Sequence, residues 1–312
     1  MRIIRNTTEF HIAEPAAVAI GKFDGIHRGH RRLLEQLRRQ QEKGLAAVVF
    51  TFVPSPASFF SGEPEVELTT LAEKRRLFAE AGVDYLIEYP FYREIADMEP
   101  ETYIREVLVE RINARCIVAG DDVSYGRGGA GDCRLLEEKA ALYGYEVMII
   151  DKVLHEGREI SSTYVREAVK RGDMELAAAL LGAPYLIVGE IVHGQRFGRT
   201  IGMPTVNLQP PRGKLLPPNG VYYSRVRLSG REYPAITNIG TKPTVADRAV
   251  TGVETYIYDF DREVYGEEQE VFLLRHTRPE RRFDGVEALK TQLASDIAAG
   301  RRYHFGTGEG RT

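Results

Sequence analysis

Apolar runs alternate with amphipathic stretches along the first half of the chain, from residue 17 to about residue 182. The short apolar runs predict buried strands, and the segments between them carry apolar residues at helical spacing. This strand–helix–strand repeat predicts a parallel sheet with helices on both faces, a Rossmann-like α/β domain. The predicted strands are AVAIG, AAVVFTF, VDYLIEY, CIVAG and YEVMIID. The predicted helices are HRRLLEQLRRQQEKG, LAEKRRLFAEAG (opened by a Thr70–Glu73 capping box) and segments near residues 100–113 and 132–143.

The pattern changes in the second half, where β-rich runs are separated by Gly/Pro turns. Several runs alternate between apolar and polar residues, and β-branched residues and tyrosine are frequent in them. The runs are YLIVGEIVHG, GVYYSRVRL, YPAITNIG, TGVETYIYDF and QEVFLLR. Five or six strands with one helix near residues 284–299 predict a small antiparallel β-barrel with a C-terminal helix. A Gly-Ala-Pro break in LLGAPY, residues 180–185, predicts two domains, residues 1–182 and 183–312.

Composition narrows the class of protein. Of 312 residues, 43% are hydrophobic and 28% charged, which is typical of a soluble globular protein. No apolar run is long enough to cross a membrane, and the N-terminus lacks a signal-peptide core. A net charge of -3 argues against nucleic-acid binding. Cys116 and Cys133 form neither a CxxC motif nor a disulfide framework, so a cytoplasmic location is expected.

The stretch GKFDGIHRGH, residues 21–30, places His27 and His30 where a predicted strand passes into a helix. Free backbone N–H groups and the positive end of the helix dipole favour an anion there, and Gly25 and Gly29 permit close approach. Phosphate is therefore the favoured ligand. Metal binding is an alternative, although no third ligand of fitting spacing is nearby. Capping or solvated histidines are the other alternative.

A second helix start has the same character. ISSTYVR, residues 160–166, follows a strand and supplies the hydroxyls of Ser162 and Thr163, with Arg166 one turn later. An ordinary Ser/Thr N-cap explains the stretch when it is taken alone. Two such helix starts at the carboxyl edge of one parallel sheet favour a phosphate site.

The stretch GRGGAG, residues 126–131, satisfies the dinucleotide-binding pattern and has Asp151 twenty residues after its last glycine. The preceding strand ends near Gly120, however, and DDVSY separates it from Gly126. The pattern requires its first glycine directly after the strand. A glycine loop over an active site is therefore the better interpretation.

These motifs, taken in order, resemble the bacterial bifunctional riboflavin kinase/FMN adenylyltransferase family, also called FAD synthetase. GKFDGIHRGH, TFVPSP and ISSTYVR are similar to motifs of its adenylyltransferase half. HGQRFGRTIGMPTVNL, LPPNGVYY, TNIGTKPT and VETYIYDF are similar to successive riboflavin kinase motifs. The resemblance extends from about residue 17 to residue 296. It departs from the family in the loop GDDVSYG, where Val123 replaces an aromatic residue.

The resemblance implies that the N-terminal domain transfers AMP from ATP to the phosphate of FMN, giving FAD and pyrophosphate. FMN phosphate is already an anionic nucleophile, so positioning and charge neutralisation suffice and no base is needed. His27 and His30 would donate hydrogen bonds to the transferred phosphate, and Arg166, Ser162 and Thr163 would contact the β- and γ-phosphates. The same resemblance extends nucleotide or flavin binding to Gly21, Phe23, Asp24, Gly25, Gly29 and Tyr125. A turn-forming role for Asp24 is an equal alternative.

The resemblance implies that the C-terminal domain phosphorylates riboflavin with ATP, giving FMN and ADP. The acceptor hydroxyl is neutral and benefits from a carboxylate base, which would be Glu254. Thr205 and Asn207 alternate on one strand face and would hold Mg²⁺ together, while Gly194, Gly198 and Gly202 would let a loop fold over the ATP phosphates. An exposed strand carboxylate and a structural Thr/Asn pair are the alternatives.

Two rival functions stay open at this point. Either domain could have lost its chemistry and serve as a flavin- or nucleotide-binding module. Alternatively, the protein could be a nucleotidyltransferase for another phosphorylated vitamin. The intact motifs in both halves argue against each rival.

Overall fold

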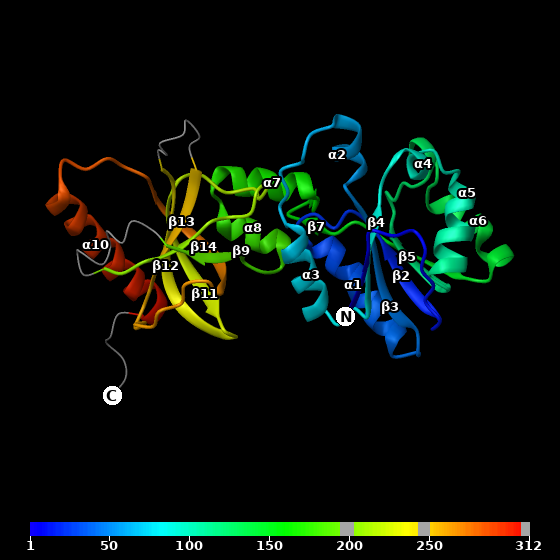
Figure 1. Ribbon diagram of the computed structural model, residues 1–312, viewed down its shortest axis with the longest axis horizontal. Coiled ribbons are helices and arrows are strands. Elements are labelled where there is room, and N and C mark those ends of the chain that lie inside the picture. The colour runs from blue at the N-terminus through cyan, green and yellow to red at the C-terminus, as the bar shows by residue number, and fades with distance from the viewer. Residues whose placement is uncertain (194–202, 243–249, 307–312) are drawn as a thin grey trace. The chain divides into compact units, whose positions relative to one another are not determined.

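A computed structural model describes residues 1–193, 203–242 and 250–306, and Figure 1 labels its helices and strands. The chain divides into two compact units, Met1–Ser162 and Thr163–Thr312. This division, at 162/163, reflects packing and does not test which residues each activity requires. The functional boundary at 182/183 therefore stays a prediction.

The first unit is built on a six-stranded sheet in the order β1-β4-β3-β2-β5-β6, and all neighbouring strands are parallel. The predicted parallel sheet is confirmed. The strands are β1 (Arg2–Arg5), β2 (Ala16–Ile20), β3 (Ala46–Val53), β4 (Tyr85–Pro90), β5 (Ala114–Gly120) and β6 (Glu146–Ile150). The chain runs from β2 to β4 in one direction and then places β5 on the other side of β2. This reversal is a switch point, where ligands bind at the carboxyl ends of the strands.

Helices cover both faces of this sheet (Figure 1). Ile20 and Phe50 pack into one apolar cluster, while their strand neighbours Ala19 and Val49 pack into the cluster on the opposite face. Burial on both faces explains why these strands are continuously apolar in sequence. The helices are α1 (Arg28–Gln41), α2 (Pro56–Ser61), α3 (Leu71–Glu80), α4 (Arg93–Ala96), α5 (Pro100–Thr102), the π-helix η1 (Tyr103–Arg111), the 3₁₀ turn η2 (Arg127–Gly129) and α6 (Cys133–Tyr143).

Two local predictions are tested by these helices. The capping box of α3 is present, since the backbone N–H of Glu73 donates to Thr70 Oγ1 and the backbone N–H of Thr70 donates to the Glu73 carboxylate. The helix predicted near residues 100–113 is instead a short α5 followed by the π-helix η1. After β6, a small hairpin of β7 (Leu154–His155) and β8 (Arg158–Glu159) leads to α7 (Ser162–Arg171).

The second unit contains a closed barrel in the order β10-β13-β12-β11-β14-β9, and the paired strands are antiparallel. The predicted antiparallel barrel is confirmed. Its strands are β9 (Tyr185–Val192), β10 (Val206–Leu208), β11 (Gly220–Leu228), β12 (Arg231–Lys242), β13 (Val250–Ile257) and β14 (Glu268–Pro279).

Two helices pack on this barrel. The helix α8 (Met174–Leu181) contacts β9 and β14, and α10 (Val286–Phe305) contacts β12. On α10, Gly300 is required by close packing, because a Cβ there would lie 2.5 Å from both Ile236 Cδ1 and the Tyr258 hydroxyl. The predicted C-terminal helix is therefore confirmed and fixed to the barrel wall.

Candidate active sites

The loop between β2 and α1, residues 21–27, lies at the switch point of the parallel sheet. Two of its non-glycine residues have left-handed backbones, Phe23 with φ 51° and Ile26 with φ 42°, and Gly25 has φ 90°. Phe23 and Ile26 are also buried in the core beneath α1, which holds these costly conformations in place. Strain of this kind is typical of loops whose geometry serves a site.

The two predicted histidines lie side by side at the end of this loop. Their rings are stacked, with centroids 3.9 Å apart and planes 23° apart. His27 occupies the N-cap position of α1 without capping it, and the buried Nδ1 atoms of His27 and His30 make no hydrogen bond within the described residues. Phe23 packs against His30 at 5.1 Å. A Cβ at Gly29 would lie 3.1 Å from the His27 ring, so glycine leaves that ring its place.

Both imidazoles are neutral at neutral pH. Burial lowers the pKa of His27 from 6.5 to about 4, although the charges of Asp122, Asp24 and Glu159 oppose this change. Burial lowers the pKa of His30 well below its usual value, helped by the neighbouring His27 and by Lys74. Each neutral ring offers one N–H donor and one acceptor, and a buried unpaired ring nitrogen is costly without a ligand. The pair is therefore suited to bind an oxyanion by hydrogen bonds.

Asp24 connects this loop to two other segments. Its buried carboxylate accepts hydrogen bonds from the backbone N–H groups of Leu68 (2.8 Å) and Thr69 (3.3 Å). Its carbonyl accepts a hydrogen bond of 2.8 Å from the Ser162 hydroxyl. The structure therefore brings the first residue of α7 to the histidine loop, as the paired helix starts predict. Thr163 and Arg166 follow on α7 within the second compact unit.

Tyr125 lies inside the first unit and is only 3% exposed. Its ring packs against Tyr103 at 5.4 Å, and its hydroxyl donates to the Asp132 carbonyl at 3.2 Å. A Cβ at Gly131 would lie 2.4 Å from the Tyr125 ring, so this glycine serves packing. These contacts give no support to the predicted role of Tyr125 in ligand binding. Phe23 is also fully buried, and it packs against the His30 ring, so its contacts hold that ring in place.

The glycine stretch 126–131 does not follow its strand directly, because β5 ends at Gly120. Five residues separate that strand end from Gly126. The segment continues through η2 into α6 instead of opening a helix over a pyrophosphate. The segment therefore lacks the direct step from strand to glycine that the dinucleotide-binding pattern requires.

In the barrel, Asn207 of β10 lies directly opposite Glu254 of β13. On the other side of β13, Glu254 lies opposite Asn238 of β12. The residues flanking Glu254 in sequence, Val253 and Thr255, are fully buried, so Glu254 and its two asparagine neighbours share the opposite face of the wall. The register thus brings together the predicted base and one predicted metal ligand.

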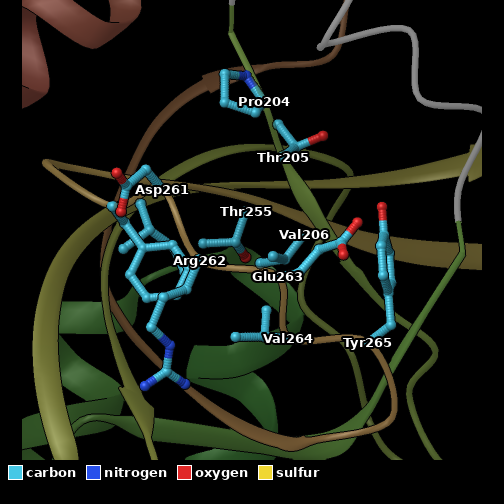
Figure 2. A pocket seen from close by; sticks show the side chains of 11 residues that line it. Pro204, Thr205, Val206, Thr255, Asp261, Arg262, Glu263, Val264 and Tyr265 are labelled. Carbon is cyan, nitrogen blue, oxygen red and sulfur yellow. The ribbon is translucent and has the colours of Figure 1, made fainter.

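The other predicted metal ligand, Thr205, lines a cavity of about 310 Å³ (Figure 2). The connection that follows β13 forms much of its wall. Tyr265 of that connection packs against His193, with ring centroids 3.9 Å apart and planes tilted by 31°. Gly194, Gly198 and Gly202 lie outside the described residues, and their predicted role is untested. The lining residues are Pro204, Thr205, Val206, Thr255, Ile257, Phe260, Asp261, Arg262, Glu263, Val264 and Tyr265.

Two features of the first site were missed from the sequence. Phe78 of α3 packs edge-on against Phe23 at 5.3 Å and so backs the ring that contacts His30. Asp122 and Glu159, together with Asp24, supply the negative charge that acts on His27. The GDD sequence after a predicted strand was a usable signal for Asp122, since strand ends of a parallel sheet meet at one edge. Nothing in the local sequence marks Glu159.

Two family models match the chain in order. One, described as FAD synthetase, matches residues 9–164, and the other, described as riboflavin kinase, matches residues 181–304. In the parts of the chain with described structure, no group of three or more His, Cys, Asp or Glu residues could hold a metal ion. Within the same parts, no helix is both long and apolar enough to cross a membrane.

Curated relatives match over most of both chains. The bifunctional riboflavin kinase/FMN adenylyltransferase of Escherichia coli strain K12 is 37% identical over 308 residues, covering 97% of this chain and 98% of that protein. The protein of the same description from Listeria monocytogenes is 38% identical and covers 89% of each chain. A solved structure described as a macrolide-efflux protein from Streptococcus pneumoniae has a TM-score of 0.84 and 32% identity, covering 96% of this chain and 98% of that one.

Proposed function

This chain belongs to the bifunctional riboflavin kinase/FMN adenylyltransferase family, and we propose that residues 1–182 carry the adenylyl transfer and residues 183–312 the riboflavin phosphorylation. The protein is a transferase that converts riboflavin to FMN and FMN to FAD, with ATP consumed in both steps. The ordered match of the two family models is the observation that carries the assignment.

In the adenylyl transfer, the FMN phosphate attacks the α-phosphate of ATP and pyrophosphate leaves. His27 and His30 donate hydrogen bonds to the oxygens on which charge grows, a role favoured by their neutral rings and unpaired Nδ1 atoms. Gly21, Gly25 and Gly29 allow the backbone to approach the phosphates. Ser162, Thr163 and Arg166 contact the β- and γ-phosphates. Asp24 holds the loop in place through its own hydrogen bonds.

In the kinase reaction, Glu254 accepts the proton of the terminal ribityl hydroxyl as that oxygen attacks the γ-phosphate of ATP. The position of Glu254 opposite Asn207 supports this role, because base and phosphate then meet on one face of the barrel wall. The cavity beside Thr205 is of the size typical of small-molecule sites. It is lined by Thr255, whose side chain lies on the opposite face of β13 from Glu254, so we do not assign it to the phosphates. Gly194, Gly198 and Gly202 belong to the loop proposed to cover the phosphates.

Mg²⁺ is proposed as the metal that accompanies ATP. Thr205 and Asn207 would hold it in the kinase domain, since a hydroxyl and an amide oxygen are hard donors of the kind Mg²⁺ accepts alongside phosphates. When bound, the ion would neutralise charge on the transferred phosphoryl group. A cytoplasmic location is proposed from the composition and from the use of ATP.

A single assay tests the pair of activities. The purified chain is incubated with riboflavin, ATP and Mg²⁺, and the flavins are separated by chromatography over time. FMN should form first and then be converted to FAD. Accumulation of FMN without FAD would leave the first domain as a binding module. If riboflavin is not used but a parallel incubation with FMN and ATP yields FAD, the second domain would be the binding module.

A further inference from the structure

A lysine that belongs to no recognised motif lies at the carboxyl edge of the parallel sheet. The last rung between β5 and β6 pairs Gly120 with Ile150. Asp122 and Lys152 each follow two residues later, and their side chains meet with Lys152 Nζ 3.4 Å from Asp122 Oδ2. Lys152 Nζ also lies 2.7 Å from Glu159 Oε1. One ammonium thus bridges two carboxylates beyond the ends of neighbouring strands.

This cluster is connected to the histidine loop through the backbone. The N–H of Ile160, the residue after Glu159, donates to the Val153 carbonyl at 2.8 Å. Two residues further on, the Ser162 hydroxyl donates to the carbonyl of Asp24 in the histidine loop. The charges of Asp122 and Glu159 also act on His27. Lys152 therefore belongs to the same edge of the sheet as the stacked histidines.

The charges of the cluster do not balance. One cation and two carboxylates leave one negative charge beside a site for polyphosphate. The side chains of Lys152, Asp122 and Glu159 are 35%, 70% and 41% exposed, so each ion pair contributes little in water. The flexible lysine stem can exchange one carboxylate for a phosphate oxygen, while the released carboxylate returns to water. The Glu159 hydrogen bond raises the pKa of Lys152, which keeps the ammonium charged.

We propose that Lys152 is a polyphosphate-binding residue of the adenylyl-transfer site, which exchanges one of its two carboxylate partners for a phosphate oxygen of ATP or of the pyrophosphate product. The proposal rests on the proposed adenylyltransferase function of this unit. A charged hydrogen bond to phosphate is stronger than one between neutral groups. Loss of the Lys152 ammonium should therefore weaken the binding of ATP and pyrophosphate and leave the binding of FMN unchanged.

The test uses the full chain with Lys152→Met, Lys152→Arg and, as a matched control, Lys139→Met. Lys139 is also ion-paired, 2.7 Å from Glu101, but it lies on α6 and not at the strand ends. Initial rates of FAD formation give KM for ATP and for FMN, and the reverse reaction of FAD with inorganic pyrophosphate gives KM for pyrophosphate. Riboflavin phosphorylation and thermal unfolding are measured on each variant.

For Lys152→Met, KM for ATP and for pyrophosphate should each rise about tenfold or more, with KM for FMN within about twofold of the parent. Lys152→Arg should recover most of the affinity, and Lys139→Met should match the parent. Unchanged KM for ATP and pyrophosphate, a rise confined to FMN, or an equal effect of Lys139→Met would each overturn the proposal. A parent chain that forms no FAD would instead contradict the function on which it rests.

Discussion

The two proposed sites differ in the kind of polar group that each places for phosphate transfer. In the first unit, two stacked imidazoles are buried and neutral at the start of a helix. In the barrel, the carboxylate of Glu254 lies opposite the amide of Asn207 on a partly exposed wall. One site offers hydrogen-bond donors held by a strained loop, and the other offers an acceptor held by strand register.

The difference follows from the two nucleophiles. FMN phosphate arrives already ionised, so no base is needed to take a proton from it. The ribityl hydroxyl is neutral and gains from a carboxylate that takes its proton. The charge of the acceptor therefore decides which residue types each fold must place, independently of whether the sheet is parallel or closed into a barrel.

The largest expected effect comes from Glu254→Gln, which removes the base and keeps the shape of the side chain. FMN formation should fall by about 10²–10⁴ in rate, because the amide cannot accept the proton. Conversion of supplied FMN to FAD should be unchanged. Initial rates of both reactions in the same preparation provide the measurement.

Glu190→Gln is the matched control, since Glu190 is an exposed carboxylate on β9 of the same barrel. It should phosphorylate riboflavin at the parental rate. If Glu254→Gln stays within a few-fold of the parent, Glu254 is not the base. The two sites would then both work by positioning alone.

A somewhat smaller loss is expected from His27→Ala or His30→Ala. Removing one donor from a charge-stabilising site costs about 10²–10³ in rate. FAD formation should fall by that factor while riboflavin phosphorylation continues. His11→Ala is the control, because His11 is an exposed histidine of the same unit. A parallel loss of both activities in a folded variant would contradict the separation of the sites.

The elements that sequence predicted well share one physical property: their signal is local. The apolar strands of the first unit are buried on both faces, and continuous apolar runs such as AAVVFTF predict that burial. The capping box at Thr70 is likewise contained within four residues. The GKFDGIHRGH stretch was recognisable because strand, glycine loop and helix start are consecutive.

The features that could not be predicted from the sequence depend on contacts between distant segments. The burial of Tyr125 under Gly131 and the hydrogen bonds of Asp24 to Leu68 and Thr69 require the folded chain. The ion pair of Asp122 with Lys152 depends on the register of β5 with β6. The short edge strand β1 was overlooked because four residues carry too little periodicity to stand out.

The boundary between the two regions can be tested by truncation. A fragment beginning at residue 183 lacks α8, which contacts the barrel strands β9 and β14 and has four buried residues, Met174, Ala177, Leu180 and Leu181. It should still phosphorylate riboflavin. Its free energy of unfolding should be lower by at least about 2 kcal/mol than that of a fragment beginning at residue 163. Denaturant unfolding of the two fragments gives the comparison. Equal stabilities would show that α8 contributes nothing to the barrel.

The smallest effect concerns the neutral histidines and appears in stability rather than in rate. The pKa of His27 is about 4 in the folded chain, against 6.5 when exposed. Between these values the unfolded chain binds a proton that the folded chain excludes, so the free energy of unfolding falls as pH drops through this window. At about pH 5 the loss from His27 should be at most about 2 kcal/mol relative to about pH 7.5.

Replacing His27 by Gln should remove the part of the pH dependence of the unfolding free energy that comes from His27, since glutamine does not titrate. Denaturant unfolding of the parent, His27→Gln and His11→Gln at the two pH values measures it. The parent and His11→Gln should lose stability equally, and His27→Gln should lose less. If all three slopes agree, burial does not hold His27 neutral. The contrast between a neutral donor site and a charged acceptor site would then have to rest on Glu254 alone, because an imidazolium could stabilise phosphate as a cation instead.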